Sequence, residues 1–352
     1  MNRSYCIIVL FLILPPLNCH NGNMTDIFDI RDDYNMSKKY VATILFSLML
    51  LYGIVGNILL TTVFCSRNSM YSRPFIFIAI QIIICSFLNF VTQIIIVIPE
   101  IVKKKISYSY KPTLIQRIFA SIDTASFFGI LHFTFLLTVN RFVVICSPKY
   151  NGIFESIKLY FLLICVWFSV LGFSVTEFNY CIKSFNVPIL QWSLNCTNNI
   201  SENGEVFKKI RYVWTLALPV AMFAIYIAIF RNIRQKRKNS LVLCKASGYK
   251  TKIAGKYERL MLIQSAIVCG AFEIEIICFY FLFKFAVKLA GKKVEIPVNI
   301  FINCYVIFNG ALLPTVNLFF VKKFRSSVKR TVVELSSKIT SKKRLSTNII
   351  AM

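Results

Sequence analysis

Residues 114–146 read LIQRIFASIDTASFFGILHFTFLLTVNRFVVIC, an almost wholly apolar run whose interior is interrupted by Asp123, His132 and Arg141. The run is long enough to cross a membrane as a helix, which takes roughly 20 residues. Asp123 and Arg141 are 18 positions apart. That spacing is five whole helical turns, so both side chains leave one face of the helix, about 27 Å apart along its axis. His132, halfway between them, faces the other way.

Charged side chains inside a membrane are costly and usually face a cavity or a partner. Asp123 and Arg141 are therefore candidate functional residues at the two ends of one helix. A polar stripe of Ser126, Thr134 and Thr138 joins them at helical spacing. Arg141 could instead be an arginine that snorkels to the membrane interface.

The composition indicates an integral membrane protein. The chain has 352 residues, of which 57% are hydrophobic, and a mean hydropathy of +0.65. A net charge of +26 would suggest a nucleic-acid partner in a soluble protein. In a membrane protein the Lys and Arg residues report orientation instead, so we expect no nucleic-acid partner.

Motifs for metal binding or covalent chemistry are missing from the sequence. The 12 cysteines are scattered, without CxxC pairs or Cys/His clusters at metal-binding spacing. The sequence has no phosphate-binding glycine loop and no nucleophile elbow. We therefore expect no metal, no cofactor and no enzymatic activity.

Seven long apolar segments predict an all-α bundle of seven transmembrane helices, because irregular backbone cannot face lipid. The segments cover residues 41–65, 73–98, 114–146, 157–177, 210–232, 258–284 and 298–321. Residues 1–19 are interpreted as a signal peptide, either cleaved or kept as an anchor. Residues 20–40 form a polar external segment, 41–321 the seven-span domain and 322–352 a basic tail. Residues 322–330 predict an amphipathic helix on anionic membrane lipid.

Sequons and basic residues together predict an external N-terminus and an internal C-terminus. Beyond the signal peptide, all four N-x-S/T sequons fall in segments that this topology places outside, where N-glycosylation occurs: Asn23, Asn35, Asn195 and Asn199. The segments placed inside carry more of the Lys and Arg. The longest external loop contains Cys181 and Cys196, which we expect to pair in an oxidising exterior; two free thiols are the alternative. A disulfide would contribute about 3 kcal/mol.

Polar and aromatic residues within the seven spans resemble those of rhodopsin-like G-protein-coupled receptors. The matching residues are Gly56-Asn57, Asn140-Arg141-Phe142 in the place of the Asp/Glu-Arg-Tyr box, Trp167, Pro219, and Leu313-Pro314-Thr315-Val316-Asn317 in the place of Asn-Pro-x-x-Tyr. Three departures stand out. Gln81 replaces the family's sodium-binding aspartate, the sixth span has no proline, and Asn317 replaces the tyrosine of the seventh-span motif.

Other details are similar to nematode chemoreceptors of serpentine class X. They are Asn140-Arg141-Phe142 followed by Pro148-Lys149-Tyr150 and Ile153-Phe154, Gln81, the loop cysteines Cys181 and Cys196 with Trp192, and Glu258-Arg259-Leu260 running into Gln264-Ser265. The resemblance covers about residues 45–330.

This resemblance implies a receptor that detects an external small molecule or peptide and activates a heterotrimeric G protein. It places the protein in the plasma membrane. In a sensory neuron this would be the membrane of the cilium. The implied coupling residues are Asn140, Arg141, Phe142 and Glu258. Glu258 either contacts Arg141 until activation opens the pair, or only balances Lys256 and Arg259 in water. A seven-span channel or transporter is the alternative, although no internal repeat is visible. An odorant channel with an internal N-terminus is a further alternative, which the signal peptide and sequons disfavour.

The resemblance also implies a ligand pocket around Asp123, because amine receptors of this superfamily place their amine-binding acid there. Glu273 of the sixth span is a second candidate acid, and Phe127 would add a cation–π contact to a cationic ligand. The alternative is that these acids pair internally, Asp123 with Arg117 and Glu273 with Lys284.

Overall fold

The computed structural model of this protein describes residues 29–65, 71–103, 114–154, 156–196, 203–247, 256–322, 324–330 and 333. The predicted signal peptide, Asn23, Asn199 and most of the tail lie outside the described residues. Glu258 lies in a described helix, but its side chain is not described, so the Arg141–Glu258 contact stays a prediction. Residues 324–330 are helical, in the region of the predicted amphipathic helix.

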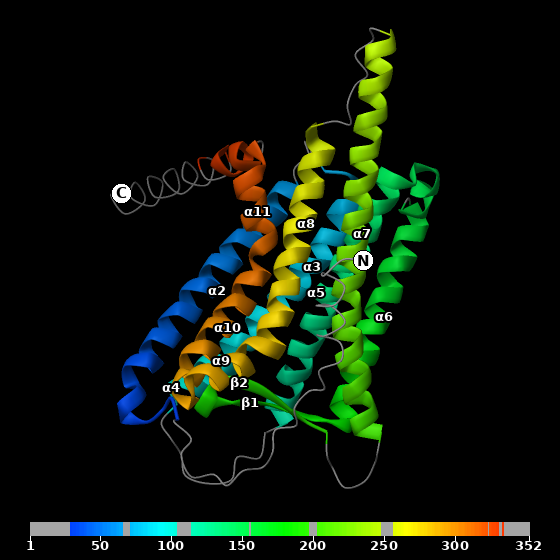
Figure 1. The fold of residues 1–352 in the computed structure, drawn as a ribbon. Coiled ribbons are helices and arrows are strands. Elements are labelled where there is room, and N and C mark those ends of the chain that lie inside the picture. Colours follow the sequence, from blue (N-terminus) through cyan, green and yellow to red (C-terminus); the bar gives the residue numbers. More distant parts are fainter. Residues whose placement is uncertain are drawn as a thin grey trace, which may run out of the picture.

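The described chain forms a bundle of long helices (Figure 1). They are α2 (Met36–Cys65), α3 (Arg73–Thr92), α4 (Ile98–Val102), α5 (Leu114–Cys146), α6 (Ser156–Tyr180), α7 (Asn203–Ser247), α8 (Lys256–Ile277), α9 (Phe283–Ala290), α10 (Glu295–Gly310) and α11 (Leu312–Phe320). Two π-helical turns, Gln93–Val97 and Cys278–Leu282, join α3 to α4 and α8 to α9. α3 with α4, and α8 with α9, are therefore each one span.

Six of these helical spans are long and apolar enough to cross a membrane, and the bent pair α10–α11 makes a seventh. The prediction of an all-α, seven-span membrane bundle is therefore confirmed. Helix α5 has the predicted limits, 114–146. α7 is much longer than the predicted apolar segment 210–232, because its helix continues past the apolar residues into a polar stretch.

The bend of 64° between α10 and α11 follows from Pro314. Proline has no N–H, so the carbonyl of Gly310, four residues earlier, loses its helical partner. Asn57 of α2 donates its side-chain amide to this carbonyl at 2.9 Å. A side chain at Gly56 would come within 3.2 Å of the Pro314 ring. The Gly56-Asn57 pair and Pro314 are thus complementary parts of one contact between the first and seventh spans.

α5 lies at the centre of the bundle and packs closely against α3 (Figure 1). A Cβ at Gly129 would lie 2.4 Å from Cys85 Sγ, so this position admits only glycine without a shift of Cys85. Trp167 of α6 donates its indole N–H to Gln81 Oε1 of α3 at 3.0 Å. Gln81 and Trp167, two of the family marks, therefore join α3 to α6.

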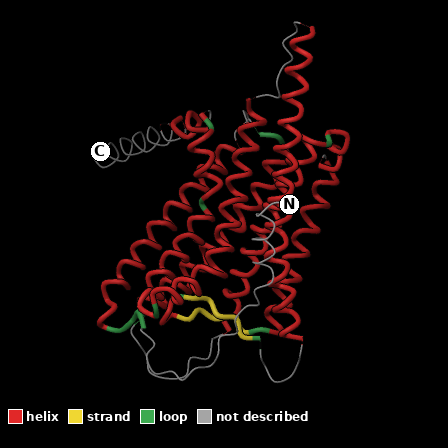
Figure 2. Tube along the Cα trace, in the orientation of Figure 1, coloured by secondary structure: helices red, strands yellow, loops and turns green. Residues whose placement is uncertain are grey.

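A β-hairpin that the sequence did not predict closes one end of the bundle (Figure 2). Strands β1 (Ile182–Asn186) and β2 (Gln191–Asn195) pair antiparallel. The predicted Cys181–Cys196 disulfide is confirmed and joins the two residues that flank the hairpin. Asn299 and Asn303 of α10 donate to the carbonyls of Ile189 and Leu190 at the tip, at 2.6 and 2.8 Å.

We call this end of the bundle the hairpin end. The opposite end, where α5 and α11 finish and α8 begins, we call the tail end. The hairpin is held by the disulfide at one side and by α10 at the other, so it covers the hairpin end of the bundle.

Candidate functional site

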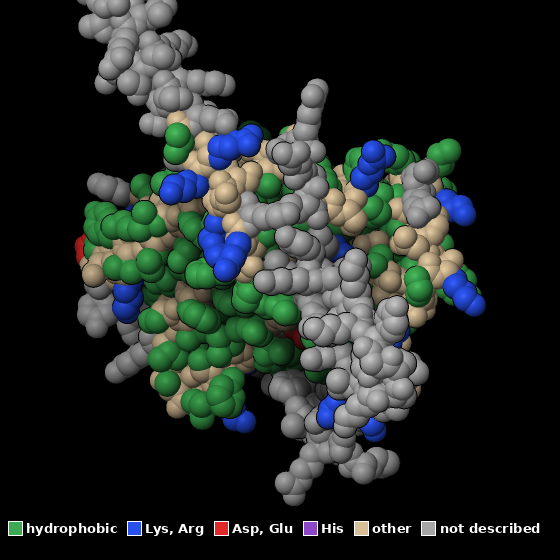
Figure 3. All heavy atoms as spheres, turned by 90° about the horizontal axis from the view of Figure 1, so that it is seen from above, with side chains coloured by type: hydrophobic (Ala, Val, Ile, Leu, Met, Phe, Trp, Pro, Cys, Tyr) green, Lys and Arg blue, Asp and Glu red, His purple; other side chains and the backbone are tan. Residues whose placement is uncertain are grey.

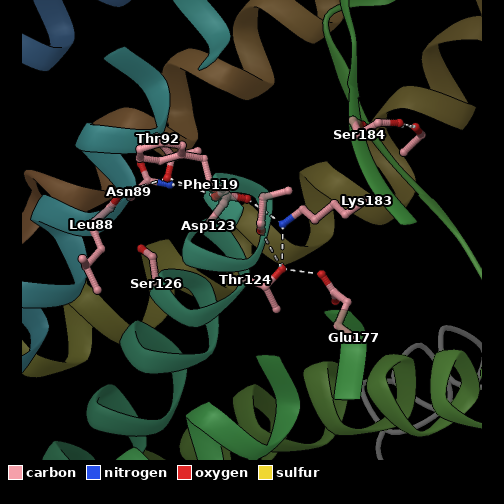
Figure 4. A network of polar contacts seen from close by, with 12 residues as sticks. Leu88, Asn89, Thr92, Phe119, Asp123, Thr124, Ser126, Glu177, Lys183 and Ser184 are labelled. Carbon is pink, nitrogen blue, oxygen red and sulfur yellow. Dashed lines mark hydrogen bonds and ion pairs between the residues drawn. The ribbon is translucent and has the colours of Figure 1, made fainter. Parts of the chain in front are cut away.

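Lys183 reaches from β1 into the hairpin end of the bundle and bonds two neighbouring residues of α5 (Figure 4). Its Nζ donates to Asp123 Oδ2 at 2.7 Å and to Thr124 Oγ1 at 2.9 Å. Asn89 of α3 donates to the other Asp123 oxygen at 3.1 Å. The Lys183 and Asp123 side chains are only 9% and 11% exposed. Asp123 is thus neutralised from within the protein, by a lysine of the hairpin.

A second buried ion pair adjoins the first. Glu177 of α6 is 2% exposed and pairs with Arg211 of α7 at 3.2 Å. The Thr124 hydroxyl donates to the Glu177 carboxylate and accepts from Lys183, so it links the two pairs. α5, α6, α7 and β1 are therefore tied together by one network of balanced charge. Such balance allows ions to remain in a membrane interior, because each has a partner of opposite sign.

A third buried carboxylate comes from α8. Glu275 is 6% exposed and accepts from the side-chain amide of Asn309 in α10. Among the residues that the structure describes, no Lys or Arg forms a salt bridge with it. Glu273 is half-buried, and its carboxylate lies 3.6 Å from the Cys269 thiol in the same helix. The Phe127 ring packs against a phenylalanine ring of α8 at 5.7 Å.

His132 faces α7, on the side of α5 away from Arg141, as its helical position predicts. Its Nε2 accepts the Trp214 indole N–H at 2.8 Å. Its ring lies 6.0 Å from the rings of Phe128 and Phe173, which stack on each other at 4.5 Å. His132 is therefore part of an aromatic cluster between α5, α6 and α7.

At the tail end, Arg141 is buried and lies on an aromatic ring of α3. Its guanidinium carbon is 4.7 Å from the centroid of Phe75. The ring of Tyr71, just before α3, stacks on the Phe75 ring, with the ring centroids 5.1 Å apart and 16° between the planes. The Tyr71 hydroxyl donates to Asn317 Oδ1 in α11. Gln264 of α8 donates to the same oxygen at 3.2 Å.

The family comparison agrees with this architecture. A family model described as serpentine type 7TM GPCR chemoreceptor Srx matches residues 46–306. This chain belongs to the Srx family. A comparison with curated proteins gives no match. The protein is accordingly a seven-span membrane chemoreceptor.

The structure places the predicted pocket residues of this Srx receptor apart from their predicted internal partners. Arg117 donates to the Phe178 carbonyl at 3.1 Å and lies over the Phe178 ring, while Asp123 forms its salt bridge with Lys183. Lys284 is exposed, and Glu273 forms no salt bridge within the described part of the chain. The structure thus pairs Asp123 with Lys183 and not with the predicted Arg117.

Several residues of these networks were not singled out from the sequence. Glu177, Arg211 and Glu275 lie within or at the edge of predicted spans, where the rule that flagged Asp123 applies to them equally. Lys183 lies in a loop, and no sequence signal aims it at α5. The Arg141 guanidinium meets an aromatic ring, which a search for acidic partners cannot find.

Two predicted glycosylation sites differ in their surroundings. Asn195 is exposed at the end of β2. Asn35 is 1% exposed, and its amide nitrogen donates to the Asp29 carbonyl at 2.9 Å. That nitrogen is the atom to which a glycan would be attached, so a glycan on Asn35 would require this buried side chain to become exposed. Asp29 also bonds Arg31, and this hydrogen bond raises the pKa of the Arg31 guanidinium above its usual value.

Proposed function

We propose that this Srx receptor binds an external chemical beneath the hairpin and activates a heterotrimeric G protein at the tail end. The observation that carries the proposal is the design of α5. This helix bears Asp123, in a buried ionic network, near one end and buried Arg141 near the other. A ligand that alters the ionic network of Asp123 can shift the equilibrium between two packings of the bundle. The surroundings of Arg141 at the tail end would differ between these two packings.

The orientation that we propose has the hairpin outside and the tail end inside, in the plasma membrane. Exposed Asn195 on the hairpin supports this orientation, since glycans are attached only outside. The face seen in Figure 3, which is the tail end, carries Lys and Arg side chains around its rim. Cytoplasmic surfaces are enriched in these residues, and anionic lipid attracts them.

We propose that the ligand site includes Asp123, Phe127 and Glu273, with Lys183 and Glu275 as further members. The hairpin supplies Lys183, so ligand binding and hairpin position are coupled through the Asp123 contact. The ligand is a small molecule or a peptide. The coupling surface that we propose comprises Asn140, Arg141, Phe142 and Glu258, in keeping with the motif order of the family.

A reconstituted receptor tests this function. We would place the purified receptor in lipid nanodiscs with purified G-protein trimers, screen a chemical library for guanine-nucleotide exchange, and record ligand-evoked current from liposomes in parallel. Exchange that depends on a ligand, without current, is expected. Arg141→Ala should abolish exchange while binding of the same ligand persists. Ligand-evoked current without exchange would instead identify a channel and refute the proposal.

Asp123→Asn tests the ligand site with the first agonist found. The substitution leaves buried Lys183 without its carboxylate, so surface expression should fall. In the receptor that reaches the surface we expect agonist potency to fall at least tenfold, about 1.4 kcal/mol. Unchanged potency in the surviving receptor would show that Asp123 has a structural role only.

A further inference from the structure

Two hydrogen-bond donors from separate segments converge on one oxygen at the tail end. Asn317 Oδ1 accepts from the Tyr71 hydroxyl and from Gln264 Nε2. All three residues are buried: Gln264 and Asn317 are 0% exposed and Tyr71 is 7% exposed. The three side chains connect the segment before α3, the helix α8 and the helix α11. Helices α8 and α11 lie side by side (Figure 1).

The acceptor is held in a fixed orientation. The amide nitrogen of Asn317 donates to the Leu313 carbonyl in its own helix at 2.7 Å, so its oxygen must face Tyr71 and Gln264. α8 cannot move away from α11 at this level without breaking the Gln264 bond. A buried oxygen that loses its donors without gaining water is costly.

The same cluster extends to Arg141 through stacked side chains. The guanidinium of Arg141 lies over Phe75, and Phe75 stacks on the Tyr71 ring. A continuous path of contacts therefore runs from α5 through α3 and α11 to α8. Phe75 and Tyr71 therefore connect Arg141 to the oxygen that holds α8. A movement of Arg141 away from Phe75 would disturb the same stacked rings.

We propose that Tyr71 and Gln264 are positioning residues for coupling: Gln264 latches α8 to α11 through Asn317, and Tyr71 holds the same Asn317 oxygen in place. The inference rests on the proposed function only for its consequence, G-protein activation. Release of the latch frees the tail end of α8 to move outward. Asn317, the shared acceptor, stands at the place of the family's seventh-span tyrosine.

The test uses Tyr71→Phe, which removes the hydroxyl and keeps the ring that stacks on Phe75, and Gln264→Met, which removes the donor at similar volume. Tyr52→Phe is the matched control, because the Tyr52 hydroxyl lies 2.8 Å from Thr315 Oγ1 of α11 and does not involve α8. The full receptor in nanodiscs is measured without ligand. One readout is basal nucleotide exchange on a G protein.

The second readout does not depend on a G protein. Spin labels at Ile263 of α8 and Lys158 of α6, both exposed, report the distance between these helices when exposed free cysteines have been replaced. Loss of one hydrogen bond should raise the open population, and with it basal exchange, about two- to tenfold. The increase in the double variant should be smaller than the product of the increases in the two single variants, because both residues donate to one oxygen.

Each outcome decides the proposal. Longer label distances in Tyr71→Phe and Gln264→Met, with Tyr52→Phe like the wild type, support the latch. Unchanged distances in monodisperse variants, or an equal change in Tyr52→Phe, overturn it. Longer distances without exchange on any G protein would uphold the latch and refute the proposed coupling.

Discussion

Replacement of Lys183 by Met should destabilise the receptor by about 3–5 kcal/mol. The substitution keeps the length of the side chain and removes its charge. Asp123 would then remain buried with only the Asn89 amide as a described hydrogen-bond donor. Breaking one partner of a buried ion pair leaves an uncompensated charge, and that is the source of the estimated cost.

The chain offers a control with the same pair of groups at the same distance. Lys103 Nζ lies 2.7 Å from Glu100 Oε1, but the Lys103 side chain is 56% exposed. Glu100 is 7% exposed, but water reaches the pair through the exposed lysine, and Gln116 still donates to Glu100. Lys103→Met should therefore cost less than Lys183→Met. Unfolding of the purified variants by SDS in mixed micelles gives the free-energy differences.

A double variant isolates the cause. Lys183→Met combined with Asp123→Asn removes both charges, and the amide can still accept from Asn89. Because a buried pair often contributes little net stability, the double variant should recover most of the loss. If it is as unstable as Lys183→Met alone, or if Lys183→Met costs no more than Lys103→Met, the uncompensated-charge argument is refuted.

Two further predictions concern the surface and the packing of the bundle. Asn195→Gln should remove one glycosidase-sensitive mobility shift from receptor made in animal cells, whereas Asn35→Gln should leave the pattern unchanged; a shift with Asn35→Gln would contradict the buried amide. Gly129→Ala should lower unfolding stability by about 1–3 kcal/mol through the clash with Cys85, and Cys85→Ala in the same chain should restore it. A Gly129→Ala variant of wild-type stability would show that Cys85 moves freely.

Hydropathy and family marks predicted the membrane bundle well, because spans are long and their composition is extreme. The limits of α5 agree with its apolar run. The long extension of α7 was not predictable in this way, since a helix that leaves the membrane carries no apolar signal. The family motif identifies Asn57 and Pro314 but does not say that they act together. In the structure, Asn57 donates to the carbonyl that lacks a partner because Pro314 has no N–H.

The charge networks were harder to predict from sequence. Intramembrane position flags Asp123 and Glu275 equally, yet the partner of Asp123 is a loop lysine. Lys183 reaches α5 from β1, where the register pairs it with Leu194 of β2 and the Cys181–Cys196 disulfide closes the open end of the hairpin. Registers of short loop hairpins depend on tertiary contacts, here those of the hairpin tip with α10.

The tail end raises a different question, namely whether neutral hydrogen bonds or an Arg141–Glu258 ion pair holds α8 in place. An ion pair near the membrane surface weakens as the Debye length falls from about 10 Å at 0.1 M salt to about 3 Å at 1 M. Hydrogen bonds among Tyr71, Gln264 and Asn317 are not screened in this way. We therefore expect the label distance between Ile263 and Lys158 to be the same at both salt concentrations in wild-type receptor. A salt-dependent increase, abolished by Glu258→Gln, would assign the hold on α8 to the ion pair.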